Sequence, residues 1–404
     1  MKQKTIRDLP DSALSGRRVL MRVDYNVPLA GGTITDDARI TATLPTLRYL
    51  LERDARIVLM SHMGRPKGEW KDGLSLRPAA EHLAELLDAP VTFVSDVVGS
   101  DARGTAAALR DGEVLVLENT RFLPGEETND PHLAEELAGL GDIYVNDAFG
   151  AAHRAHASTV GAAEHMKREG KPAVAGLLME SELRFLGGAL ESPDRPFVAI
   201  LGGAKISGKI DVIDNLLPRV DRLLIGGAMA NTFFRAMGLS VGDSLVEEDR
   251  VEMAASLLER AGDKLVLPTD CVVAEEVSSK ATTRSVTREE VPDGWKILDI
   301  GPRSVSRFNG ELDGARTVIW NGPVGMFELE PFAGGTEGVA RAVADLTDQG
   351  ATTIIGGGDT AAAVDAAGLS RRMTHVSTGG GASLEFLEGR VLPGVAVLDD
   401  KEGS

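Results

Sequence analysis

Glycine-rich turns flanked by lysine and aspartate are the groups of this chain best suited to chemistry. Four apolar runs end in consecutive glycines that open a helix-like stretch: the run at 197–201 leads into GGAK, that at 222–225 into GGAMA, that at 352–355 into GGGDT, and that at 374–376 into STGGGAS. Bare backbone at the start of a helix presents N–H groups that bind anions, most often phosphate. The four turns therefore predict a nucleotide site.

Lys205 and Lys209 belong to a near match to the phosphate-binding P-loop. Residues 203–209 read GAKISGK, but Ile210 stands where a P-loop has Ser or Thr, and isoleucine cannot ligate Mg²⁺, so an ordinary P-loop enzyme is disfavoured. Both lysines are expected in the first turn of a helix, where the helix dipole disfavours cations. This placement favours a bound anion; the alternative is that both side chains extend into water.

Asp359 follows three glycines and precedes a helix-like run, TAAAVDAAG. An aspartate in this place is a good helix N-cap. A carboxylate beside a phosphate-binding turn can also hold Mg²⁺, and the near match to the P-loop leaves the metal in need of an oxygen ligand. We favour the metal role over the cap.

Arginine and histidine gather where the apolar runs of the first half end. Arg39 follows the first run, His62 and Arg65 the second, Arg121 the third, and Arg154 the fourth. The carboxyl ends of parallel strands lie on one edge of a sheet, so these side chains should converge in one crevice. Guanidinium groups bind carboxylate and phosphate in bidentate geometry, which predicts a polyanion site. A zinc site at His153 and His156 is disfavoured because no third ligand is near in sequence.

Composition limits the class of protein. The 404 residues predict two domains. The net charge of −18 disfavours binding to nucleic acid or to anionic membranes, so an anionic ligand must meet a local basic cluster. Cys271 is the only cysteine, which excludes an internal disulfide. No apolar run is long enough to span a membrane and the N-terminus lacks an apolar signal core, so we expect a cytoplasmic protein.

Buried-strand patterns alternate with amphipathic stretches through both halves. Strands that are apolar at nearly every position indicate parallel sheets covered on both faces, and hence an α/β fold with two doubly wound domains. Apolar residues at 179, 183, 186 and 190 predict a helix between the domains. The last residues, VLPGVAVLDDKEGS, are expected to form a short strand and a polar tail.

Taken together, the motifs resemble those of phosphoglycerate kinases over nearly the whole chain. The matching segments are RVDYNVP (22–28), SHMGRPKG (61–68), LENTRF (117–122), NDAFGAAHRAHAST (146–159), GGAKISGKI (202–210), DIGP (299–302), WNGPVGMFE (320–328), GGGDT (356–360) and STGGGASLEFLEG (377–389). The resemblance implies reversible phosphoryl transfer between 1,3-bisphosphoglycerate and ADP, giving 3-phosphoglycerate and ATP in glycolysis, with Mg²⁺ as part of the nucleotide substrate. It also implies a monomer with an N-terminal domain at 1–172, a hinge helix at 173–191, a nucleotide domain at 192–389, and a tail at 390–404 that packs on the first domain.

The resemblance assigns residues to two sites. Those expected to bind 3-phosphoglycerate are Asp24, Tyr25, Asn26, Arg39, His62, Met63, Gly64, Arg65, Arg121 and Arg154. Those expected to bind the nucleotide are Gly203, Lys205, Lys209, Gly226, Gly227, Asn321, Glu328, Gly356, Gly357, Gly358, Asp359 and Thr360, with Asp359 toward Mg²⁺.

The expected chemistry needs positive charge more than proton transfer. A carboxylate nucleophile has an ordinary pKa near 4 and is already ionised at pH 7, so the moving phosphoryl group requires stabilisation and in-line positioning. Our hypothesis is that Arg39, Lys205, Gly379 and Gly380 surround this group after the two domains close. The alternatives are a different two-domain kinase and a nucleotide-binding scaffold without catalysis.

A few positions depart from the family's usual pattern. Ala228 and Asn231 stand where a glycine and an aromatic residue are general, Gly208 where an aspartate is frequent, and Tyr25 where phenylalanine is commoner. These changes bear on packing and on the adenine wall rather than on the charges.

Overall fold

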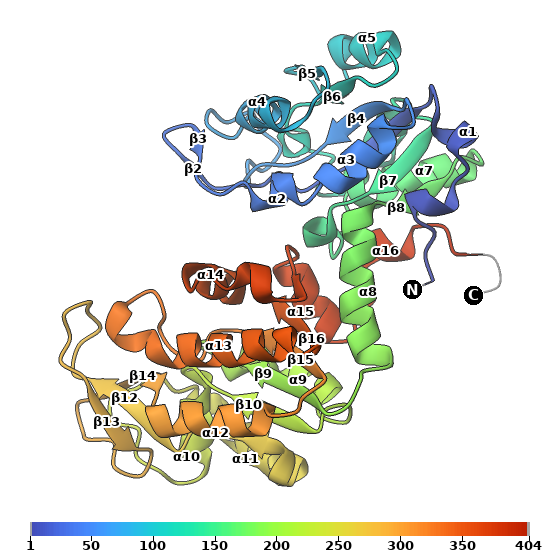
Figure 1. The fold of residues 1–404 in the computed structure, drawn as a ribbon. Coiled ribbons are helices and arrows are strands. Elements are labelled where there is room, and N and C mark those ends of the chain that lie inside the picture. Colours follow the sequence, from blue (N-terminus) through green and yellow to red (C-terminus); the bar gives the residue numbers. More distant parts are fainter. Residues whose placement is uncertain (1, 402–404) are drawn as a thin grey trace. The chain divides into compact units, whose positions relative to one another are not determined.

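The computed structural model describes residues 2–401, and its chain divides into two compact units. The described parts of Met1–Arg184 and Val391–Ser404 form the first unit, and Phe185–Arg390 form the second (Figure 1). The boundary falls within helix α8 (Leu177–Glu191). Residues 402–404 of the predicted tail lie outside the described residues. No described helix has the length and apolar character that a membrane span requires.

The first unit contains a six-stranded parallel sheet in the order β5-β6-β4-β1-β7-β8. Its strands alternate with helices along the chain, so every connection crosses over a face of the sheet. The strands are β1 (Arg18–Arg22), β4 (Arg56–Met60), β5 (Val91–Phe93), β6 (Val114–Val116), β7 (Ile143–Asn146) and β8 (Ala173–Ala175), beside a small ribbon of β2 (Leu29–Ala30) and β3 (Thr33–Ile34). The helices are α1 (Asp11–Leu14), α2 (Ala38–Thr41), α3 (Leu44–Leu51), α4 (Arg77–Leu86), α5 (Ser100–Ala108), α6 (Pro131–Ala138), α7 (Ala162–Arg168) and α16 (Pro393–Ala396).

The second unit repeats this plan with the order β11-β10-β9-β15-β16-β17, again all parallel. Its strands are β9 (Phe197–Leu201), β10 (Arg222–Ile225), β11 (Leu265–Val266), β15 (Thr317–Asn321), β16 (Thr352–Gly356) and β17 (His375–Val376). Its helices are α9 (Ile210–Leu216), α10 (Met229–Ala236), α11 (Val251–Ala261), α12 (Pro302–Leu312), α13 (Gly334–Asp348), α14 (Gly358–Ala366) and α15 (Gly381–Leu387). The prediction of two doubly wound α/β domains is confirmed.

Burial explains why the strands read as continuous apolar runs. Every residue of β7, β9 and β15 is buried, because helices cover both faces of each sheet. In the first unit one face packs against α3 and α4 through residues such as Leu47 and Leu83. In the second unit the equivalent core includes Phe308 of α12 and Val343 of α13.

Two features differ from the sequence-based expectations. The second unit carries a small antiparallel sheet, β13-β12-β14, made of β12 (Asp270–Ala274), β13 (Arg284–Thr287) and β14 (Lys296–Ile300), which the apolar pattern did not predict. The predicted C-terminal strand is wrong, because residues Pro393–Ala396 form the short helix α16. Proline at the first helical position favours this turn, and the buried side chains of Leu392 and Val395 anchor it.

Asp147 fixes the start of helix α8. This fully buried carboxylate follows β7, and its Oδ1 accepts hydrogen bonds from the backbone N–H groups of Leu178 (2.9 Å) and Met179 (3.1 Å). The N–H of Leu177 donates to the hydroxyl of Thr46 at 2.9 Å. Side chains of the first unit therefore satisfy three amides that a helix start leaves without intrahelical partners.

The pH dependence of stability should reveal the cost of burying Asp147. Burial raises the pKa of this carboxyl from 3.8 to about 7. The folded state therefore holds its proton more tightly than the unfolded state, and this contribution to stability is present below pH 3.8 and is lost as the pH rises toward 7. We expect Asp147→Asn, which keeps the Oδ1 acceptor, to remove this loss. Chemical unfolding of both proteins between about pH 4 and 7 measures it, and parallel curves would contradict the assignment.

Candidate active site

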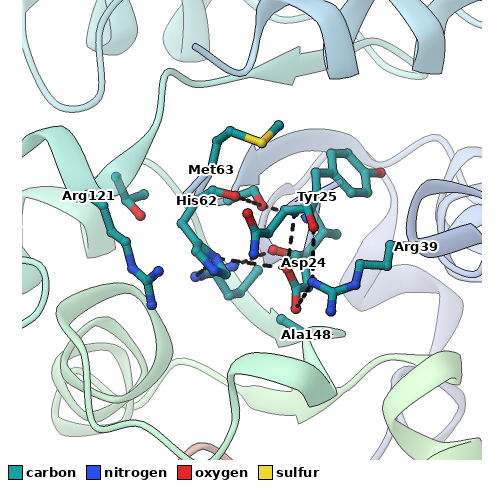
Figure 2. A network of polar contacts seen from close by, with 12 residues as sticks. Asp24, Tyr25, Arg39, His62, Met63, Arg121 and Ala148 are labelled. Atoms are coloured by element: carbon teal, nitrogen blue, oxygen red, sulfur yellow. Dashed lines mark hydrogen bonds and ion pairs between the residues drawn. The ribbon is translucent and has the colours of Figure 1, made fainter. Parts of the chain in front are cut away.

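The first cluster of polar side chains lies at the carboxyl edge of the first sheet (Figure 2). Arg39 of α2 donates from Nη1 to Oδ2 of Asp24 (3.1 Å) and to the carbonyl of Asn26 (3.1 Å). The amide oxygen of Asn26 accepts the backbone N–H of Gly64 at 2.8 Å. Asp24 and Asn26 follow β1 and Gly64 follows the neighbouring strand β4, so the loop after β1 holds Arg39 and the loop after β4 holds Asn26.

Arg121 joins this cluster from the loop after β6. Its Nη1 donates to the carbonyl of Gly64 at 2.8 Å, and its Nε lies 3.3 Å from Glu127. Burial lowers the pKa of this guanidinium from its usual value, with the carboxylate of Glu127 acting in the opposite direction. Loops after three neighbouring strands thus supply Asp24, Gly64 and Arg121 to one edge of the sheet, as the sequence predicted.

His62 is buried beside two arginines and is neutral at pH 7. Its Nδ1 lies 3.1 Å from Nη2 of Arg22 and 3.9 Å from Oδ1 of Asp24. Burial first, and then the charges of Arg22 and Arg121, lower the pKa of His62 well below 6.5. Burial and the same two arginines lower the pKa of the nearby His156 to about 4. The positive charge of this site therefore comes from its arginines.

The other residues predicted to bind 3-phosphoglycerate differ in their exposure. Arg65 and Arg154 are exposed at the same edge. Tyr25 is fully buried: its hydroxyl hydrogen-bonds to Thr43 at 2.9 Å and its backbone N–H donates to the Ser61 hydroxyl at 2.8 Å, so it supports the loop rather than facing a ligand. Met63 is also buried, and its carbonyl accepts from Asn119 at 2.8 Å.

Sequence reasoning missed two charged residues under the cluster. Arg22 is completely buried and donates from Nε to the hydroxyl of Ser158 at 2.8 Å. Glu126 is also completely buried, and it accepts the Ser158 hydroxyl at 2.5 Å and the Thr120 hydroxyl at 3.2 Å. A charged residue inside an apolar strand, as in RVLMRV, was the available signal for Arg22, because buried charges are rare unless they are paired.

The second cluster lies at the carboxyl edge of the second sheet. Lys209 precedes α9, and its Nζ donates to Oδ1 of Asn321, the last residue of β15. Burial lowers the pKa of this ammonium to about 8, although the carboxylate of Asp359 opposes the shift. The amide nitrogen of Asn321 is buried and has no hydrogen-bond partner among the described residues. Thr360 accepts the backbone N–H of Gly322 at 2.6 Å.

The glycine turns have two different roles. The N–H of Gly203 donates to Pro323 (2.9 Å) and that of Gly227 to Val324 (2.9 Å), so these two amides bind the protein rather than a phosphate. A Cβ on Gly227 would lie 2.6 Å from the backbone of Gly203. These glycines, with Gly226 beside Val324, allow three backbone segments to approach one another. Our expectation that every turn offers its N–H groups to phosphate is therefore wrong for Gly203 and Gly227.

The turns after β16 and β17 remain open to an anion. Helix α14 starts after Gly357, which has a φ of +85°, and no side chain caps its first amides. Asp359 lies exposed inside its first turn and Gly357 holds the N-cap position, so the disfavoured alternative, in which Asp359 is only an N-cap, is wrong. Gly380 precedes α15 in the same way, while the N–H of Gly379 donates to the Ser377 hydroxyl at 3.1 Å.

Two predicted positions are more loosely tied to this cluster. Lys205 is exposed just before a 3₁₀ turn at Ile206–Gly208, and Lys209 occupies the N-cap position of α9 without a side-chain capping hydrogen bond. The expectation that both lysines lie in the first turn of that helix is therefore wrong. Glu328 is exposed on the turn after β15. Among the described residues, no group of three or more His, Cys, Asp or Glu side chains is arranged to hold a metal ion. His153 and His156 are therefore not part of such a group.

Comparison with known proteins shows to which family the chain is similar. The family model described as phosphoglycerate kinase matches residues 8–390. The phosphoglycerate kinase of Herpetosiphon aurantiacus is 58% identical over 405 residues, covering 99% of this chain and 100% of that protein. That of Chloroflexus aurantiacus is 58% identical over 408 residues, with both chains fully covered.

Solved structures give the same result at the level of the fold. The phosphoglycerate kinase of Coxiella burnetii superposes with a TM-score of 0.87 at 41% identity, and that of Pyrococcus horikoshii with 0.84 at 35%; each comparison covers 98% of both chains. With sequence and fold in agreement over nearly its whole length, this chain belongs to the phosphoglycerate kinase family of phosphotransferases.

Proposed function

We propose that the protein transfers a phosphoryl group reversibly between 1,3-bisphosphoglycerate and ADP, with 3-phosphoglycerate bound at the first cluster and the nucleotide at the second. The observation that carries this proposal is the pairing of one arginine-rich sheet edge with one lysine- and glycine-rich sheet edge on separate units. In the first, Arg39, Arg65, Arg121 and Arg154 supply charge for the carboxylate and phosphate of a small acid.

Different residues of the second edge are assigned to different parts of the nucleotide. We assign Lys209 to a nucleotide phosphate, and the open amides at the start of α14 to a neighbouring phosphate. The buried amide nitrogen of Asn321, which lacks a partner among the described residues, can donate a further hydrogen bond there. Arg39, Lys205 and the amides near Gly379 and Gly380 are assigned to the phosphoryl group in transfer.

Asp359 fits the role of the Mg²⁺ ligand. Its carboxylate is exposed in the first turn of α14, beside the glycines and close enough to Lys209 to affect its pKa. Magnesium ions in kinases are usually held by one or two carboxylates together with substrate phosphates and water, so a single aspartate suffices. When bound, the ion would neutralise phosphate charge during transfer.

A coupled assay tests the activity directly. Purified protein with 3-phosphoglycerate and MgATP should form 1,3-bisphosphoglycerate, followed by the consumption of NADH in a second enzymatic step. Chelation of Mg²⁺ should abolish the signal, and Asp359→Asn should raise the Mg²⁺ concentration required. A protein that binds ADP but shows no turnover above the enzyme-free blank would instead be a nucleotide-binding scaffold.

Lys209 should make nucleotide binding sensitive to pH. Because burial lowers the pKa of Lys209 to about 8, its charge is present below this pH and is lost above it. We expect the affinity for ADP to fall by up to about tenfold per pH unit above pH 8. Titration calorimetry between about pH 7 and 9 measures this fall. Lys209→Arg, which stays charged, should bind with a flatter profile, and identical profiles would exclude the role.

The two sites must be brought together for transfer, since they lie on different units. We propose that helix α8, which contains the boundary between the units, carries the hinge. Small-angle X-ray scattering should show a smaller radius of gyration with 3-phosphoglycerate and a non-hydrolysable ATP analogue together than with either alone. An unchanged radius in the ternary complex would contradict closure.

A further inference from the structure

Arg22 is a charged side chain that the proposed reaction leaves unused. It is the last residue of β1, completely buried, while Arg18 at the other end of the same strand is paired with Asp142 at 2.9 Å. Three hydrogen bonds fix its guanidinium: Nε to the Ser158 hydroxyl (2.8 Å), Nη1 to the carbonyl of Val23, and Nη2 to Nδ1 of His62 (3.1 Å). Because the guanidinium is buried and held at three points, its Nη2–H is directed at Nδ1 of His62.

The contact between Arg22 and His62 determines where the imidazole carries its proton. Arginine only donates hydrogen bonds, so Nδ1 of His62 must accept. The Nδ1–H tautomer and the imidazolium ion both carry a proton on Nδ1. This proton would face the N–H of Arg22, so neither form can make the contact. The remaining form is neutral, with its proton on Nε2.

We propose that Arg22 is a positioning residue that holds His62 as the neutral Nε2–H tautomer, so that His62 donates a hydrogen bond to an oxygen of 3-phosphoglycerate. This inference rests on the proposed function, which places that substrate at His62. The carboxylate and phosphate oxygens of the substrate accept hydrogen bonds only, so the unprotonated nitrogen of the opposite tautomer would repel them. Nε2 has no hydrogen-bond partner among the described residues, and the His62 side chain keeps 7% of its exposure.

The charges around His62 support the same state. The titratable and charged neighbours of His62 come from five elements. They are Arg22 of β1, Asp24 of the loop after β1 (Oδ1 at 3.9 Å from Nδ1 of His62), Arg39 of α2, Arg121 of the turn after β6 and His156 of the loop after β7. Burial and the three arginines lower the pKa of His62, and Asp24 is the one carboxylate among these neighbours in the described chain. Protonation at neutral pH is therefore disfavoured from several sides, while the direct contact with Arg22 alone selects between the two neutral tautomers.

The tautomer can be measured without substrate. Two-bond ¹H–¹⁵N correlation spectra distinguish a protonated from an unprotonated ring nitrogen, and His62→Gln identifies the His62 signals among the 7 histidines. We expect wild-type His62 to show a protonated Nε2 and an unprotonated Nδ1 throughout about pH 6 to 8. A protonated Nδ1, or an imidazolium at pH 7, would overturn the proposal. This spectrum is independent of turnover, so an inactive protein with the expected tautomer would refute the proposed function and leave the tautomer established.

A variant tests whether Arg22 causes this state. In Arg22→Met, His62 should populate both tautomers and titrate nearer its usual pKa of about 6.5. The KM for 3-phosphoglycerate should rise about tenfold and become pH-dependent, while the KM for MgATP stays unchanged. Arg18→Met is the matched control at the other end of β1, and its spectrum and KM values should equal those of the wild type.

A double variant separates positioning from a general structural effect. If Arg22 acts through His62, Arg22→Met should raise the KM for 3-phosphoglycerate much less in a His62→Gln background than in the wild type. An equal rise in both backgrounds, or an unchanged His62 spectrum in Arg22→Met, would contradict the role. If Arg22→Met does not fold, the wild-type spectrum alone decides whether the tautomer exists.

Discussion

Arg39→Ala is expected to lower kcat by about 10²–10³-fold, the usual cost of removing one group that stabilises a transition state. Arg39 is held by Asp24 and by the carbonyl of Asn26, so its guanidinium is oriented before substrate binds. The nucleophile needs no general base, so the main requirement of the reaction is positive charge that stabilises the phosphoryl group during transfer. The KM for MgATP should change by less than about twofold, because the residues proposed to bind the nucleotide lie on the other unit.

Steady-state kinetics with each substrate varied in turn separates these effects. Arg48→Ala, an exposed arginine on the neighbouring helix α3, is the matched control and should leave kcat unchanged. Arg39→Lys should recover only part of the activity, since an ammonium group cannot reproduce the bidentate hydrogen bonding of a guanidinium group. A normal kcat in Arg39→Ala would remove this residue from the proposed mechanism.

Gly322→Ala is expected to destabilise the second unit by about 3 kcal/mol or more, and to abolish ADP binding at ordinary concentrations. A Cβ at this position would lie 2.2 Å from the carbonyl oxygen of Gly202, and Gly322 has a φ of +99°. The atoms that this Cβ would meet belong to the backbone of Gly202, so no flexible side chain can move aside. The Gly322 N–H also donates to Thr360 beside the predicted nucleotide phosphates.

Differential scanning calorimetry and ADP titration measure the two parts of this prediction. The control is Gly208→Ala, because no heavy atom lies within 4 Å of the added Cβ and the residue has no positive φ. Gly208→Ala should shift the unfolding temperature by only a degree or two. If Gly322→Ala unfolds and binds ADP like the control, the close approach of the glycine turns has no energetic importance.

Much of the first site could be predicted because its geometry follows from a simple rule. Arg39, His62 and Arg121 each follow an apolar run, and parallel strands bring the ends of such runs to one edge. Arg22 was missed because it stands inside a run, where sequence alone cannot show that a buried guanidinium meets Ser158 and His62.

The second site was harder to predict in detail. A glycine in the sequence shows that the backbone needs freedom, but not whether its N–H faces a ligand or another strand. Gly203 and Gly227 bind protein carbonyls, whereas the amides after Gly357 remain open. The antiparallel sheet of β12–β14 was missed because no residue of β13 is fully buried and β14 is only partly buried, so both strands lack the continuous apolar pattern.

The first unit is made of two segments that the whole second unit separates along the chain, and this order matters for synthesis on the ribosome. Asn146, the last residue of β7, donates to the carbonyl of Gly394 at 2.9 Å, and the N–H of Ala173 donates to Asp399 at 2.9 Å. Gly394 and Asp399 are translated after residues 185–390, which by then have emerged or are leaving the exit tunnel. The second unit thus has its full sequence before the first unit, which reverses the usual N-terminal-first order of domain completion.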